Sequence, residues 1–133
     1  MASLQLPTYL SESIRQAIEE SRRILDLKDN WDDEGSPAYE ESTWARALDF
    51  LTLNAITLWR HRAVWVCAPR ILPGPQGSID LHWRTGGREL LVNIPASLSE
   101  PADFYGDNGS CNVIKGKLDT SEDNEWILLW LTR

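Results

Sequence analysis

Hydrophobic residues follow two different periods along the chain, and the change between them separates helical from strand-forming segments. Residues 11–28 and 36–62 repeat apolar positions at the three-to-four-residue spacing of an amphipathic helix. We predict that Ser13 caps the first helix and that Ser36-Pro37 opens the second, because serine suits the N-cap and proline the first helical position. The second helix is expected to end near residues 60–62, where basic side chains favour a helix C-terminus.

From residue 79 the period becomes two, which is typical of strands with one buried face. Apolar residues alternate with polar ones in 79–84 and again in 88–94, and Gly86-Gly87 lies between the two runs. This pattern predicts a β-hairpin. Shorter strand candidates are residues 64–67, 104–105 and 111–114, and residues 72–77 are expected to be a turn-rich connection.

The last segment, residues 119–131, is predicted to be a helix with Thr120 as its cap, because Trp126, Leu129 and Trp130 would share one face. The sequence shows no internal repeat and no linker. We therefore predict a single domain over residues 1–133 of the α+β class. It would contain an N-terminal helical hairpin packed on an antiparallel β-meander, with a C-terminal helix.

The amino-acid composition limits the kinds of molecule that the protein is expected to bind. The 133 residues include 13 basic and 20 acidic side chains, giving a net charge of −7, which argues against nucleic acids and anionic membranes as partners. No apolar run reaches the length of a membrane span, and the N-terminus lacks the pattern of a signal peptide. Cys67 and Cys111 have no CxxC spacing and are expected to be reduced thiols, so we expect a cytoplasmic protein.

The negative charge is concentrated in two segments. Residues 26–41 hold seven acidic side chains against one lysine, and residues 100–125 hold seven against two lysines. Such runs occur as solvated loops, but carboxylates that repel one another can also be kept together because a cation binds among them.

The first acidic segment partly fits the loop template of EF-hand calcium sites, D-x-[DN]-x-[DN]-G-x5-E. Asn30, Asp32 and Glu34 occupy its first, third and fifth positions, Gly35 the sixth and Glu41 the twelfth. Alternate residues of a tight loop can direct oxygen atoms inward, and calcium seeks six to eight of them.

The departures from this template are equally clear. Asparagine stands first where aspartate is expected, Pro37 cannot make the pairing that couples two such hands, and no second complete loop follows. We therefore predict a calcium-binding loop other than a regular EF-hand. Its candidate metal ligands are Asn30, Asp32, Asp33, Glu34 and Glu41. The alternative is that Asn30 and Asp32 cap turns while Asp33 and Glu34 face water.

The second acidic segment offers Asp103 and Asp107 as further candidate ligands, for a weaker second ion or for completing the first site. The sequence Asp107-Asn108-Gly109 is also a common turn signal. Catalysis has no support, because no nucleophile, zinc or phosphate-binding motif occurs and His61 and His82 lack metal-ligand spacing.

Three stretches resemble a group of small bacterial proteins that share an Asn-Trp-Asp-x-x-Gly pattern. They are residues 30–35 followed by Pro37, the Pro-x-Ile-x-Pro run at 69–73, and the Gly-x-Ile-x-Leu-x-Trp run at 77–83. The additional acids of this chain resemble those of cyanobacterial calcium-binding proteins linked to heterocyst differentiation. The resemblance implies calcium sites in acidic loops and a role in buffering free calcium.

Taken together, the residues and the resemblance predict a non-enzymatic cytosolic calcium-binding protein, a buffer or sensor, with Ca²⁺ as its ligand. The alternative is an acidic protein-interaction module that binds a basic partner and has no dedicated metal site.

Overall fold

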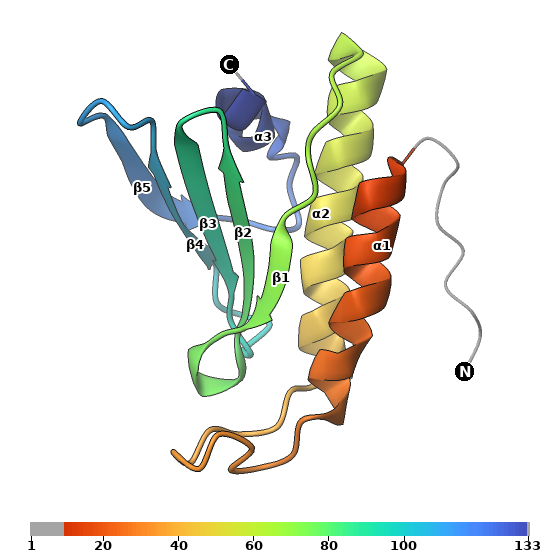
Figure 1. The fold of residues 1–133 in the computed structure, drawn as a ribbon, viewed down its shortest axis with the longest axis vertical. Helices are drawn as coiled ribbons and strands as arrows, with labels where there is room; N and C mark the ends of the chain where they lie inside the picture. The colour runs from red at the N-terminus through yellow and green to blue at the C-terminus, as the bar shows by residue number, and fades with distance from the viewer. Residues whose placement is uncertain (1–9, 133) are drawn as a thin grey trace.

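The structure, a computed structural model, describes residues 10–132 and confirms the α+β class (Figure 1). The helical elements are α1 (Glu12–Ser21), the 3-10 helix η1 (Arg22–Asp26), α2 (Glu41–Arg62), the 3-10 helix η2 (Pro75–Gly77) and α3 (Glu125–Thr132). The strands are β1 (Arg70–Pro73), β2 (Ile79–Thr85), β3 (Arg88–Ile94), β4 (Ala102–Asp107) and β5 (Val113–Leu118). All neighbouring strands are antiparallel, and the sheet order β1-β2-β3-β4-β5 is a meander.

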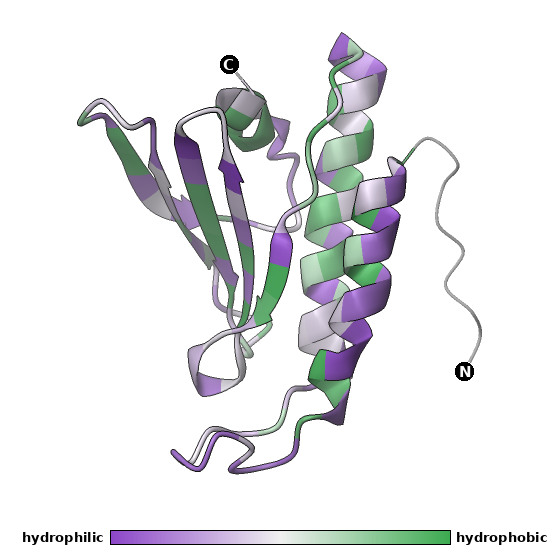
Figure 2. Ribbon diagram, viewed as in Figure 1, coloured by the Kyte–Doolittle hydropathy of each residue, from purple (hydrophilic) through white to green (hydrophobic). Residues whose placement is uncertain are grey.

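The fold has two layers, a layer of helices and the sheet, and the helices cover only one face of the sheet (Figure 1). The core lies between these two layers. Alternate residues of the central strands are buried against this layer, and Figure 2 shows the corresponding alternation of apolar and polar positions. The buried residues of β2 and β3 are Ile79, Leu81, Trp83, Leu90, Val92 and Ile94. The residues between them lie on the opposite face of the sheet, which no described element covers.

The first helix is shorter than its periodicity predicts. The α-helix ends at Ser21 and continues as the 3-10 helix η1 to Asp26. The prediction of Ser13 as its cap is wrong: Ser11 has the extended backbone of an N-cap and its Oγ accepts the Ile14 N–H at 3.3 Å, whereas Ser13 already lies within the helix. Trp44 Nε1 donates to Ser21 Oγ at 2.9 Å, joining α1 to α2.

The second helix begins at Glu41, and the prediction that Ser36-Pro37 opens it is wrong. The Ser36 hydroxyl donates to the Asp32 carboxylate at 2.5 Å instead of capping a helix, and residues 36–40 are not helical. The predicted C-terminus is confirmed, since the helix ends at Arg62 and Ala63 caps it in the left-handed conformation.

The strongest strand prediction is confirmed. Strands β2 and β3 form a hairpin in which Thr85 pairs with Arg88, and Gly86 and Gly87 both have positive φ, as a two-residue turn of this type requires. The strand predicted at 64–67 is not formed. There the chain runs as an irregular segment, and the Cys67 carbonyl accepts the Trp83 Nε1–H at 2.8 Å.

The remaining boundaries also shift. The first strand covers residues 70–73, part of which was expected to be turn. Strand β5 begins at Val113 rather than 111, because Cys111 has a φ of 68°, which is incompatible with a strand. Helix α3 begins at Glu125, so Thr120 does not cap it. Among residues 10–132 no helix combines the length and hydropathy that crossing a membrane requires.

Candidate functional site

The acidic loop, residues 26–41, joins the first two helices, and its centre is closed by its own hydrogen bonds. Asn30 Oδ1 accepts the Gly35 N–H at 2.8 Å, and the Asn30 N–H donates to the Ser36 carbonyl at 2.7 Å. Asp32 Oδ1 accepts the N–H groups of Glu34 at 3.0 Å and of Ser36 at 3.3 Å. The asparagine and the first aspartate of the motif therefore hold the turn together.

The backbone of this loop needs unusual conformations. Asn30, Asp33 and Gly35 have φ values of 63°, 61° and 84°, in the left-handed region that glycine, asparagine and aspartate tolerate best. Further along the loop, the Ala38 N–H donates to Asp29 Oδ1 at 2.9 Å. The local sequence thus supplies residues suited to each strained position.

Tyr39 anchors the loop to the rest of the fold. Its ring centroid lies 6.1 Å from that of Trp31, and its hydroxyl donates to the Gly74 carbonyl at 2.6 Å, beside the β1–β2 connection. Burial raises the pKa of Tyr39, and the negative charges of Asp32 and Asp80 raise it further. This contact fixes the position of the acidic loop relative to the sheet.

Hydrogen bonding also favours the ionised form of Asp32. The Ser36 hydroxyl has the largest effect, and the Glu34 N–H adds to it, so the pKa of Asp32 lies below its ordinary value. Loss of hydration raises the pKa of Asp32 but does not outweigh these donors.

The other predicted metal ligands of this loop do not take part in the hydrogen bonds of the turn. The side chains of Asp33, Glu34 and Glu41 are exposed and form no hydrogen bond or ion pair with any residue of 10–132. Asn30 and Asp32 share one turn, whereas Glu41 is the first residue of α2. The loop therefore separates into residues that build the turn and residues that carry uncompensated charge.

Asp103 and Asp107 are not brought together by the structure. Both lie on the uncovered face of β4 with Tyr105 between them, and four residues of strand separate their Cα atoms by about 13 Å. Asp103 pairs with Lys117 Nζ at 2.7 Å, while Asp107 Oδ1 accepts the Gly109 N–H at 2.7 Å. A single calcium ion cannot contact both carboxylates at this separation.

Within the described part of the chain, no group of three or more His, Cys, Asp or Glu side chains is placed to hold a metal ion. Calcium binding by the acidic loop would therefore require Asp33, Glu34 and Glu41 to change position. It stays a prediction.

One charged cluster was missed at the sequence level. On the uncovered face of the sheet, Glu89 Oε1 lies 3.2 Å from His82 Nε2 and Glu89 Oε2 lies 3.1 Å from Arg84 Nε. These two hydrogen bonds lower the pKa of Glu89. The hydrogen bond with His82 has the larger effect, and the one with Arg84 the smaller. The alternation of residues 79–84 placed His82 and Arg84 on one face, but only the strand register shows that Glu89 joins them.

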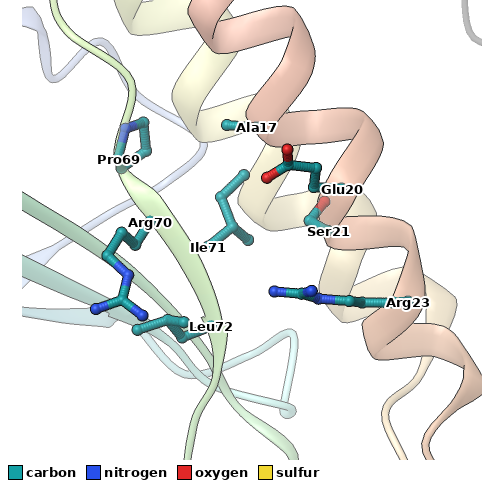
Figure 3. A pocket seen from close by; sticks show the side chains of 8 residues that line it. All are labelled: Ala17, Glu20, Ser21, Arg23, Pro69, Arg70, Ile71 and Leu72. Carbon is teal, nitrogen blue, oxygen red and sulfur yellow. The ribbon is translucent and has the colours of Figure 1, made fainter.

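A pocket of about 130 Å³ lies between α1 and β1 (Figure 3). It is lined by Ala17, Glu20, Ser21, Arg23, Pro69, Arg70, Ile71 and Leu72. The Ser21 hydroxyl donates to the Ile18 carbonyl at 2.6 Å and accepts from Trp44. No histidine or cysteine lines the pocket, and the only hydroxyl in it already has both partners, so it shows no activated nucleophile.

Comparison with known proteins adds no assignment: no family model, no curated protein and no solved structure matches this chain.

Proposed function

We propose that the protein is a non-enzymatic binding protein and that its acidic loop binds a basic segment of a partner protein. The observation that supports this proposal is a lack of charge compensation. Seven carboxylates lie in residues 26–41, and none of them forms a salt bridge within residues 10–132. Keeping such charges close together without internal partners favours an external cation.

The order of the loop strengthens this proposal. Hydrogen bonds to Asn30 and Asp32 hold the turn in one conformation, so less conformational entropy would be lost when a partner binds. Trp31 lies in the middle of the loop with 38% of its surface exposed. Tryptophan is among the residues that contribute most binding energy in protein interfaces, and the surrounding carboxylates would speed association with a basic surface.

The second candidate function is calcium binding by a cytosolic buffer or sensor. The same uncompensated carboxylates favour it, because Asp33, Glu34 and Glu41 offer the hard oxygen ligands that calcium prefers. The exposed, unpaired thiols of Cys67 and Cys111 support a cytoplasmic location in either case.

One set of variants tests both functions without damaging the turn. The loop variant combines D33N, E34Q and E41Q, which removes three charges and leaves Asn30 and Asp32 in place. The matched control combines E12Q, D49N and E122Q, which removes three charges from exposed side chains elsewhere. Calorimetric titrations at physiological salt would use a lysine- and arginine-rich peptide, and calcium in the presence of excess magnesium.

If the loop binds a basic partner, the basic peptide should bind the wild type and the control equally and the loop variant about tenfold more weakly. Equal weakening of both variants would mean that only the overall charge matters, and the site would be rejected. Saturable calcium binding that survives magnesium and disappears in the loop variant would establish the second candidate. If neither ligand binds the wild type, both proposals are wrong.

A further inference from the structure

The outer edge of β5 is the open edge of the sheet. Strand β5 pairs with β4 on one side, and no described strand lies on its other side (Figure 1). Lys115, Gly116 and Lys117 are exposed, and since Gly116 has no side chain its backbone is accessible. The opposite edge differs, because β1 has only four residues, ends in Pro73 and lies beside α1. Unpaired strand edges readily add another strand.

On the helical side of β5, an aromatic shelf is only partly covered. We define it as Phe104, Ile114, Trp126 and Trp130. Trp126 keeps 47% of its surface exposed, and its ring centroid lies 5.7 Å from that of Phe104 in an edge-to-face arrangement. The guanidinium of Arg88 lies 4.8 Å from the Trp130 ring centroid. Helix α3 therefore leaves apolar surface next to the open backbone edge.

On the other side of β5, the exposed residues are Val113, Lys115 and Lys117. Lys117 has a partner, since its Nζ lies 2.7 Å from Asp103. Lys115 stands opposite Tyr105 and has no charged partner within residues 10–132. A strand added at this edge would thus meet a positive charge on one face and apolar surface on the other.

These charges argue against a second copy of the chain as the occupant. In an antiparallel pair of two β5 strands, residues on the same face stand opposite one another. In the registers that overlap the strands most fully, Lys115 would face Lys115 or Lys117 of the other copy. Like charges directly opposite destabilise strand pairing, whereas acidic side chains at these positions would stabilise it.

We propose that the edge of β5 binds an extended segment of a partner protein in which acidic and apolar residues alternate. The segment would add to the sheet as a sixth strand, with its backbone bonded to the outer edge of β5. Its acidic side chains would lie beside Lys115 and Lys117, and its apolar side chains would cover the aromatic shelf. This inference rests on β5 and does not depend on the function of the acidic loop.

The probe is a six-residue peptide in which glutamate and valine alternate, blocked at both ends, its length matching the six residues of β5. The control peptide alternates lysine and valine. Binding to the 133-residue chain would be followed by the amide resonances of residues 113–118 and by their hydrogen exchange. We expect the acidic peptide to shift these resonances and slow their exchange, and the basic peptide to do neither.

Variants separate the proposed surface from general charge effects. K115E should weaken binding of the acidic peptide about tenfold, and W126A should weaken it through loss of the shelf. R62E makes the same charge change on an exposed arginine at the end of α2, outside the sheet and the acidic loop, and should leave binding unchanged. An equal response of residues 113–118 to both peptides, no response of β5 to either, or concentration-dependent dimerisation that K115E strengthens would overturn the proposal. The lysines would then act only to keep the edge unpaired.

Discussion

Asn54 is fully buried in α2 and joins this helix to the start of α3. Its Oδ1 accepts the Asn124 N–H at 2.8 Å across seventy residues of sequence, and its Nδ2 donates to the Phe50 carbonyl at 2.8 Å. The Asn124 side chain in turn donates to the carbonyls of Asp119 and Glu122 at 2.8 and 3.0 Å. The segment that leads into α3 is therefore held to α2 by a buried polar network.

The substitution N54L should destabilise the protein by about 2 kcal/mol. Leucine has a similar size, so little cavity is created, but it leaves the buried Asn124 N–H without an acceptor, which costs about 1–3 kcal/mol. The Phe50 carbonyl loses less, because a carbonyl inside a helix keeps its backbone partner. The substitution N54A should cost more than N54L, because it adds lost packing to the same unsatisfied donor.

Urea unfolding followed by tryptophan fluorescence measures the free energy of unfolding of both variants. The control is N112L, because Asn112 is exposed and its side chain has no hydrogen-bond partner within residues 10–132. This control should change stability by less than about 0.5 kcal/mol. If N54L is as stable as the control, the buried Asn124 N–H is satisfied in another way and the reasoning from this network is refuted.

Two further predictions concern other polar contacts. Arg46 donates to Thr120 Oγ1 at 2.9 Å and to the Glu100 carbonyl at 2.6 Å; R46K cannot span both acceptors and should lower the free energy of unfolding in urea by about 1–2 kcal/mol. Because the pKa of Asp32 is lowered in the folded protein, its contribution to stability is complete above the unfolded pKa near 4 and is lost as pH falls through the folded value. Between pH 7 and pH 3 the melting temperature should therefore fall more for the wild type than for D32N. An equal fall in both proteins would mean that ionised Asp32 does not stabilise the fold.

Sequence patterns predicted the elements whose signals are local. The β2–β3 hairpin is specified by strict alternation on both sides of Gly86-Gly87, and every part of that signal lies within sixteen residues. The core faces of α2 and β2 follow in the same way from periodicity. These features need no information from distant parts of the chain.

The predicted starts of α2 and α3 were wrong because the hydroxyl groups expected to cap these helices form hydrogen bonds with other residues. Ser36 looks like an N-cap in sequence, but its hydroxyl bonds Asp32 within the acidic loop. Thr120 looks like the cap of α3, but it accepts a hydrogen bond from Arg46 of α2, and the helix begins five residues later, next to Asn124. The first error comes from a competing partner four residues away, and the second from a partner that is distant in sequence.

The acidic loop shows why the same oxygen pattern predicts both a metal site and a turn. Alternate oxygen-bearing residues in a tight loop can meet either a cation or the N–H groups of the loop itself. Here Asn30 and Asp32 meet the N–H groups of Gly35 and Glu34, so these two oxygens are needed for folding whatever the loop binds. The side chains of Asp33 and Glu34 form no such hydrogen bonds with residues 10–132. Substituting the first pair would therefore disturb the turn and any ligand together, and only the second pair can separate function from folding.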